Sequence, residues 1–591
     1  MSTLPAVKKI RDEYPRPQFA RDFWVNLNGE WNFRFDDEDV GVREQWYNRE
    51  SAWFTDSILV PFCFQSELSG IHDIAFHDIV WYQRTFDIAD AFHGKRVMLH
   101  FGAIDYESTV WVNGCLVTVH EGGHVPFSVD VTDVLKPVGN VVVVRVYDPS
   151  DDIALPRGKQ YWLEKSESIF YTRTTGIWQT VWMEAVHETH LQRVRFTPDI
   201  DREAISIEAQ VSQLPAASTV QLQVEIWFQG QPLKREVMDC TSRMEIRTIH
   251  LGTTTQRLNQ GWLWSPEHPN LFDVRFTLML DGVECDVVKS YFGMRKIAVE
   301  DGAVYLNNFP YKMKLVLDQG YFPTGILTAP SDDDLRRDVE LVKQMGFNGV
   351  RKHQKVEDPR FLYWCDKLGL LVWGEMANAY AYSHEYVRKL TSEWQAVIER
   401  DYNHPSIVAW VPLNESWGVP NIRWNEEQRH HALAMYHLTR SLDATRLVIS
   451  NDGWEHVKSD LCTIHDYEWR RDVLCQRYQD EASAIAAMPG HRKIYVGGAT
   501  YDGAPILVTE FGGIAYKKSD WEGWGYSGAT TDEDYLARLR DVVHPLLTSP
   551  IVQGYCYTQF TDVEQEINGL LTYDRVPKVP LEEIRKINEG L

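Results

Sequence analysis

Two glutamates each follow an apolar run that has the character of a buried strand. Residues 407–418 read IVAWVPLNESWG and include Glu415, and residues 506–513 read ILVTEFGG and include Glu510. A nearly unbroken apolar run is typical of a parallel strand that is buried on both faces. A carboxylate at the end of such a strand is costly to bury unless it is hydrogen-bonded or used in chemistry.

Paired carboxylates are the minimum apparatus for cleaving a glycosidic bond. When two carboxyl groups lie about 5–5.5 Å apart, one serves as acid/base and the other as nucleophile. Like charges at that distance repel, which favours protonation of one of them. A single strand-end glutamate is more often an ion-pair partner than a catalyst. Asn414 strengthens the catalytic interpretation of Glu415, because an amide beside the acid can bind a sugar hydroxyl.

Residues 299–591 contain the elements that must position these glutamates. In this segment strand-like runs alternate with amphipathic helices, such as residues 332–345, 359–368 and 532–547. The strand-like runs are residues 312–317, 348–351, 370–375, 407–415, 447–451, 461–465, 506–510 and 552–559. Eight such units predict a (β/α)8 TIM barrel. Glu415 then ends strand 4 and Glu510 strand 7, at the face of a barrel where catalysis takes place.

The chain before residue 299 has the pattern of β-structure alone. Residues 1–187 contain many short strands, one of which ends in the hairpin signal Asn113-Gly114, and they predict a jelly-roll sugar-binding-like sandwich. Residues 188–298 have the size of an immunoglobulin-like β-sandwich. Neither segment offers a catalytic constellation, so we expect both to act mainly as scaffold.

Composition excludes several classes of partner. At 591 residues the chain is too long for one core, and its net charge of −24 argues against nucleic acid. No stretch approaches the roughly 20 apolar residues that span a bilayer, and the first 19 residues lack the apolar core of a secretory signal, so a cytoplasmic location is expected.

Scattered cysteines and the absence of a dense cluster of hard ligands predict no metal and no cofactor. Assembly into a homo-oligomer stays an open alternative.

Eight motifs carry a family resemblance over nearly the whole chain. They are LNGEWNF (27–33), GGHVPFSVDVTDVL (122–135), TTGIWQTVW (174–182), GFNGVRKHQ (346–354), CDKLGLLVWGE (365–375), HPSIVAWVPLNES (404–416), VTEFGG (508–513) and GLLTYDRVPK (569–578). With them the chain resembles glycoside hydrolase family 2, the β-galactosidase/β-glucuronidase/β-mannosidase superfamily. The resemblance implies the jelly-roll, immunoglobulin-like and barrel arrangement and a retaining mechanism.

The resemblance also implies roles for individual residues. It makes Glu415 the acid/base, from the Asn-Glu-Ser match, and Glu510 the nucleophile, from the Thr-Glu-Phe-Gly match. Arg351 matches the arginine that lies beside the nucleophile. Tyr467, in IHDYE, resembles the tyrosine that hydrogen-bonds the nucleophile.

The departures from the family pattern concern sugar recognition. Family glucuronidases carry an Asn-x-Lys pair where this chain has Glu566 and Asn568, and Phe170 stands where an aspartate of the sandwich is expected. We therefore expect a small β-linked neutral sugar, galactoside first and α-L-arabinoside second. A uronidase is the alternative, with Arg173 as the residue that could hold a carboxylate.

Five further residues are candidates for sugar contacts or for structural roles at the barrel mouth. His353 could bind substrate or pair with a neighbouring backbone group, and Glu375 could bind sugar or belong to a structural network. Trp454, after strand 5, could form a stacking platform, whereas Trp521 and Trp524 more readily cover the barrel rim. Two other functions stay open: a carbohydrate-binding scaffold without catalysis, and a transglycosylase.

Overall fold

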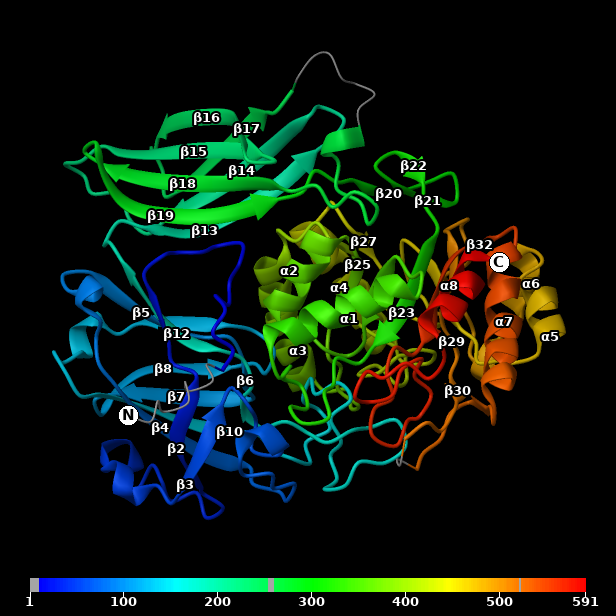
Figure 1. The fold of residues 1–591 in the computed structure, drawn as a ribbon, viewed down its shortest axis with the longest axis horizontal. Coiled ribbons are helices and arrows are strands. Elements are labelled where there is room, and N and C mark those ends of the chain that lie inside the picture. The colour runs from blue at the N-terminus through cyan, green and yellow to red at the C-terminus, as the bar shows by residue number, and fades with distance from the viewer. Residues whose placement is uncertain (1–9, 253–259, 520–521) are drawn as a thin grey trace, which may run out of the picture.

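The computed structural model describes residues 10–252, 260–519 and 522–591, which form two β-sandwiches and a barrel (Figure 1). In the view of Figure 1 the first sandwich lies beside the barrel, and the second sandwich lies across the top. No helix in these ranges is both long and apolar enough to cross a membrane.

The first sandwich consists of two antiparallel sheets. The four-stranded sheet has the order β1 (Trp24–Asn26), β12 (Val181–Val186), β5 (Arg96–Phe101), β9 (Phe127–Asp130). The six-stranded sheet has the order β3 (Asp56–Val60), β2 (Gly29–Phe35), β4 (Ile79–Phe86), β10 (Asn140–Tyr147), β7 (Glu107–Val112), β8 (Cys115–Glu121). Alternate valines of β10, such as Val142 and Val144, are fully buried in the core between the sheets. A short pair, β6 (Ile104–Asp105) and β11 (Gly176–Ile177), lies beside them.

The second sandwich shows the alternation of buried and half-exposed residues that places a strand at a sheet surface. Strand β15 (Val220–Phe228) buries Val220, Leu222, Val224 and Ile226. Its four-stranded sheet has the order β16 (Gln231–Asp239), β15, β18 (Phe272–Leu280), β19 (Val283–Phe292). The opposing sheet has the order β13 (Leu191–Asp199), β14 (Ala204–Val211), β17 (Met244–His250). A small sheet of β20 (Ile297–Glu300), β21 (Ala303–Leu306) and β22 (Phe309–Pro310) leads into the barrel.

The barrel is one parallel sheet, as the strand-like runs predict. Its order is β27 (Leu447–Val448), β26 (Ile407–Val411), β25 (Leu371–Glu375), β24 (Gly349–Lys352), β23 (Met313–Asp318), β32 (Val552–Thr558), β29 (Ile506–Gly512), β28 (Cys462–His465). The seam between β27 and β28 is tied by irregular bonds, among them His465 N–H to the Gly453 carbonyl at 3.2 Å. A pair of short strands, β30 (Ile514–Ala515) and β31 (Ser527–Gly528), follows β29.

Helices cover the outside of the barrel. They are α1 (Asp332–Gln344), α2 (Pro359–Leu368), α3 (His384–Asp401), α4 (Glu426–Leu442), α5 (Arg471–Arg477), α6 (Glu481–Ala486), α7 (Asp532–Thr548) and α8 (Leu581–Glu589). The three helices expected from periodicity lie within one residue of their predicted bounds. The side chain of Ser331 caps α1 by accepting from Asp334 N–H, and three aspartates occupy the first turn of that helix, where the helix dipole favours them.

Two predicted strands are much shorter in the structure than the sequence indicated. The run 407–415 is a strand only as far as Val411, because Pro412 has no N–H to continue the ladder. Glu415 and Ser416 then adopt positive φ values of 50° and 64° in a turn. The run 447–451 is reduced to the two residues of β27. Glu415 therefore lies beyond the strand and not on its last residue.

Candidate active site

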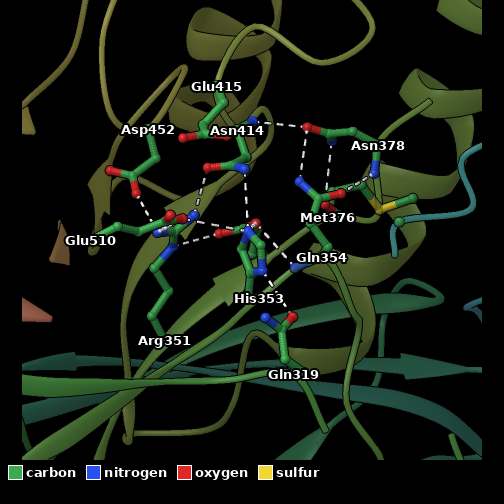
Figure 2. Close-up of polar contacts among 12 residues, drawn as sticks. Gln319, Arg351, His353, Gln354, Met376, Asn378, Asn414, Glu415, Asp452 and Glu510 are labelled. Atoms are coloured by element: carbon green, nitrogen blue, oxygen red, sulfur yellow. Dashed lines mark hydrogen bonds and ion pairs between the residues drawn. The ribbon is translucent and has the colours of Figure 1, made fainter. Parts of the chain in front are cut away.

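Arg351 is the centre of a buried ionic cluster at the barrel mouth (Figure 2). Its Nε donates to Glu375 at 2.7 Å, and its Nη1 lies 3.0 Å from Glu510 Oε1 and 2.7 Å from Asp452 Oδ2. Its Nη2 donates to Asn414 Oδ1 at 2.7 Å. One guanidinium thus orients three carboxylates and one amide, each from a different barrel strand or the turn after it.

The two predicted catalytic glutamates lie close together. Tyr467 donates its hydroxyl to Glu510 Oε2 at 2.7 Å, on the oxygen that Arg351 leaves free. A carboxylate oxygen of Glu415, one of Glu510 and a ring nitrogen of His465 all lie within 4.8 Å of one another. Oxygens this close fit the closely spaced carboxyl groups of a retaining enzyme, which lie about 5–5.5 Å apart.

His465, which the sequence analysis did not select, joins the two glutamates. Its Nδ1 lies 2.7 Å from Glu415 Oε1 and its Nε2 lies 3.0 Å from Asp452 Oδ2. Because both neighbours are acceptors, both ring nitrogens donate and the ring is an imidazolium. Burial would lower the pKa of His465, but the carboxylates of Glu510, Asp452 and Glu415 raise it to about 10. Its place at the end of strand 6, two residues before Tyr467, was the available sequence signal.

The group Glu415, His465 and Glu510 is compact enough to hold a metal ion, which is not expected from the sequence. A histidine that binds a metal must offer a lone pair from a neutral imidazole nitrogen. Both nitrogens of His465 are occupied by protons that they donate to carboxylates. The residues present therefore fit a protonated bridge better than a metal site.

His353 pairs with side chains and not with a backbone group. Arg351 holds Asn414 Oδ1, so the Asn414 amide nitrogen faces His353 Nε2 at 3.2 Å. Nε2 is then an acceptor, and Nδ1–H donates to Gln319 Oε1 at 2.9 Å. Burial lowers the pKa of His353 well below its usual value, and the charge of Arg351 lowers it further, so the ring is neutral. Figure 2 shows this chain of oriented amides.

Glu375 belongs to the same network, as one of the two interpretations of the sequence predicts. It accepts from Arg351 and from Gln354 N–H, the latter at 3.0 Å. Burial raises the pKa of Glu375 to about 7 although Arg351 opposes this shift. Burial also acts to raise the pKa of Asp452, but Arg351 and His465 outweigh it and hold that pKa far below its usual value.

Aromatic side chains surround the cluster. Trp454 lies edge-on to His465, with ring centroids 5.4 Å apart, which places it next to the acid/base candidate. Trp524 donates to the carbonyl of Ser168 at 3.1 Å and contacts Tyr526. Trp524 therefore joins the barrel rim to the first sandwich, as the rim interpretation predicts. Trp521 lies outside the described residues.

A segment of the first sandwich reaches over the barrel mouth. This segment follows β10 and is cyan in Figure 1. Phe170 contacts Tyr380 and Trp417 of barrel loops, and the hydroxyl of Tyr171 donates to Glu566. We call residues 157–172 the sandwich loop.

Arg173 does not enter the site. It donates to the carbonyls of Ile74 and Ala75, at 2.7 and 2.5 Å, and its guanidinium lies over the ring of Phe76. The sequence-based expectation that Arg173 could hold a substrate carboxylate is therefore wrong, since its Nη2 and the face of its guanidinium are both engaged by the first sandwich.

The cation that does face the site is Lys159, on the sandwich loop. It is 5% exposed, and its charge interacts with Glu566, Glu510, Glu415 and Glu375. Neither Lys159 nor Glu566 was assigned a role from sequence, because they lie in different domains and no spacing relates them.

Three models of glycosyl hydrolase family 2 match successive parts of the chain. The sugar binding domain matches residues 24–172, the central family 2 domain residues 189–295, and the TIM barrel domain residues 327–512. The three matches follow the order of the two sandwiches and the barrel.

Individual relatives include enzymes of two specificities. The chain is 27% identical to a β-galactosidase of Thermoanaerobacter pseudethanolicus over 57% of its own length and 45% of the relative's. It is 24% identical to the β-glucuronidase of Canis lupus familiaris over 78% of its length and 74% of the relative's. The chain spans less than half the length of two bacterial relatives, 40% and 45%. A β-glucuronidase structure from Ruminococcus gnavus in complex with D-glucuronic acid has the same fold, with a TM-score of 0.76 and 19% identity over 98% of this chain and 100% of that one.

Replacing His465 by Gln should change how stability depends on pH. The pKa of His465 rises from 6.5 to about 10 on folding, so its stabilisation is complete below pH 6.5 and is lost as the pH rises to about 10. The advantage of wild type over His465→Gln in the free energy of unfolding should therefore shrink across that range. Each tenfold difference in proton affinity between the folded and unfolded states contributes about 1.4 kcal/mol to this change. Urea unfolding at a series of pH values measures it.

The control is His431→Gln, because burial lowers the pKa of His431 to about 4. His431 is neutral throughout the range, so this variant should differ from wild type by a constant amount. A constant difference for His465→Gln as well would mean that His465 is not the buried cation described here.

Proposed function

Because the chain belongs to glycosyl hydrolase family 2, we propose that it is a retaining, exo-acting glycosidase that removes a terminal β-linked neutral sugar. The observation that carries this proposal is the pair Glu415 and Glu510, of which one carboxylate oxygen each lies within 4.8 Å of the other. The sandwich loop closes one side of the barrel mouth, which suits a site that receives the end of a chain. A carbohydrate-binding scaffold would have no use for two like charges held so close.

In the first step Glu510 attacks the anomeric carbon and the glycosidic bond breaks. Arg351 and Tyr467 occupy separate oxygens of Glu510 and so orient the carboxylate for attack. The leaving oxygen receives a proton from Glu415, and His465 donates along its 2.7 Å bond to the same carboxyl group. In the second step Glu415 takes a proton from water, which attacks the glycosyl–Glu510 ester with overall retention. A sugar acceptor in place of water would give transglycosylation by the same residues.

The preference for a neutral sugar is supported by the charges around the site. Four carboxyl groups interact with the buried cation of the sandwich loop, Lys159. One of them, Glu566, stands where family glucuronidases carry the asparagine of their Asn-x-Lys pair. A uronate would add another carboxylate to this group. A uronidase remains the second candidate because Lys159 is a buried cation near the site and because relatives of both specificities match the chain.

Aryl glycosides with the same aglycone test this preference. We expect the best neutral glycoside, with galactoside before α-L-arabinoside, to exceed glucuronide and galacturonide in kcat/KM by at least about tenfold, the effect of losing one charge-assisted hydrogen bond. Either uronide being the faster substrate would refute the neutral-sugar proposal. The anomeric configuration of the first product, followed by NMR, tests retention separately.

A further inference from the structure

Lys159 is a buried cation without an ion-pair or hydrogen-bond partner for its ammonium group among the described residues. Its contacts are with two aromatic faces: Nζ lies 5.3 Å from the ring centre of Tyr171 and 5.6 Å from that of Trp417. The other cations of the cluster, Arg351 and His465, have their donors engaged by carboxylates or amides. A buried ammonium is costly unless an acceptor reaches it. The missing acceptor is therefore expected to come from a ligand.

The local structure brings Lys159 to the barrel and not to solvent. Gly158 has a φ of +61°, and a Cβ there would collide with the carbonyl oxygen of Gln354. Its N–H donates to the carbonyl of Asn378 at 3.0 Å. The sandwich loop thus packs its backbone directly on the turns after β24 and β25, which only glycine allows. The next residue, Lys159, is consequently directed toward the barrel mouth.

The residues on either side of this contact fix the loop to its own domain. Arg157 donates to the carbonyls of Ser150 and Pro149 at 2.7 and 2.8 Å. Gln160 donates to Asp105 at 2.9 Å. Because both flanks are anchored, the direction of Lys159 is set before any ligand arrives.

The acceptor that complements Lys159 is Glu566. It is 3% exposed, it receives the hydroxyl of Tyr171, and it is the group with the largest electrostatic effect on Lys159. Glu566 interacts with Lys159 through its charge, but among the described residues no salt bridge or hydrogen bond joins the two. Burial raises the pKa of Glu566, against the influence of Lys159.

We infer that Lys159 and Glu566 are the specificity-determining pair that recognises hydroxyl groups of the terminal sugar. This inference rests on the proposed function. Lys159 donates to one sugar hydroxyl oxygen and Glu566 accepts from the same or a neighbouring hydroxyl. The pair replaces both the Asn-x-Lys reader and the sandwich aspartate that the chain lacks, and it takes one member from each domain.

Deoxygenated substrates test the inference. The parent is the neutral aryl glycoside that wild type cleaves fastest, and each analogue lacks one hydroxyl of its sugar. Lys159→Met should lower kcat/KM for the parent by roughly 10- to 100-fold, the effect of one hydrogen bond to a charged group. On the analogue that lacks the contacted hydroxyl, wild type and Lys159→Met should be equal. Glu566→Gln should likewise equal wild type in kcat/KM on that analogue, or on an analogue that lacks an adjacent hydroxyl.

Lys165→Met is the matched control, since Lys165 is exposed on the same loop and should not affect any substrate. The melting temperature of Lys159→Met is compared with that of wild type, so that a loss of folding is distinguished from a loss of sugar contact. Lys159→Gln keeps a donor and should recover part of the loss on the parent.

Other outcomes of these measurements would each contradict one of the proposals. An equal loss on every analogue, or no loss on the parent, would refute recognition by Lys159. A loss confined to uronides would show that Lys159 holds a carboxylate and would refute its recognition of sugar hydroxyls. A wild-type protein that cleaves no glycoside would refute the proposed function itself.

Discussion

Replacing Glu510 by Ala is expected to lower kcat on the order of 10⁵-fold, the size of effect seen when a covalent nucleophile is removed. The variant should form no glycosyl-enzyme, because the side chain removed is the one that Arg351 and Tyr467 orient. Mass spectrometry of the protein after a 2-fluoroglycoside, which traps the intermediate, should show an added sugar on wild type and none on the variant.

Glu415→Ala is the comparison that separates the two roles. Losing the acid should cost about 10²–10⁴-fold with poor leaving groups, and far less with activated aryl glycosides, which need no proton. Azide should rescue this variant by attacking the intermediate from the face that Glu415 served, giving a glycosyl azide of retained configuration. If azide gave that retained product with Glu510→Ala, the two roles would be reversed.

Arg351→Met is expected to have the largest effect on stability, a loss of about 3–5 kcal/mol in the free energy of unfolding, because it leaves buried carboxylates without their cation. Three of them, Glu375, Asp452 and Glu510, lie within 3.0 Å of the guanidinium. The deficit should shrink as the pH falls, since unpaired carboxyl groups take up protons. Urea unfolding at several pH values measures both effects.

Arg336→Met is the matched control on the surface of α1. Arg336 is 44% exposed in its side chain, with ion pairs of 3.2 and 3.6 Å to Asp333 and Glu340. Exposed pairs of this kind contribute about 0–1 kcal/mol. A similar small loss for Arg351→Met would mean that the buried cluster is not held by the guanidinium.

The barrel and the place of Glu510 could be predicted because they depend on patterns along the chain. Eight apolar runs alternating with helices specify the fold, and Glu510 lies within the seventh strand, β29. The place of Glu415 could be predicted only approximately, since Pro412 ends the strand and the following turn has positive φ. A turn of that kind leaves no periodic signal.

The rest of the site depends on contacts between segments that are distant in sequence. His465 joins the two glutamates because the register of β28 against β29 places it opposite Glu510. Lys159 lies near Glu566 because Gly158 fits against a barrel turn. Neither relation follows from composition or spacing in one sequence. The assignment of Arg173 failed for the same reason, since its partners are the carbonyls of Ile74 and Ala75.

The contact of Gly158 with the carbonyl of Gln354 has a consequence for how this protein can diversify. Bond cleavage is assigned to the barrel, whereas part of sugar selection is assigned to a loop of another domain. Substitutions in that loop can therefore change sugar selection without altering the nucleophile or the acid. The same division also constrains the interface between the two domains. A substitution that shifts their packing would move Lys159 away from the catalytic glutamates, even if those glutamates were unchanged. Inherited specificity then depends on preserving an interface as much as on preserving a pocket.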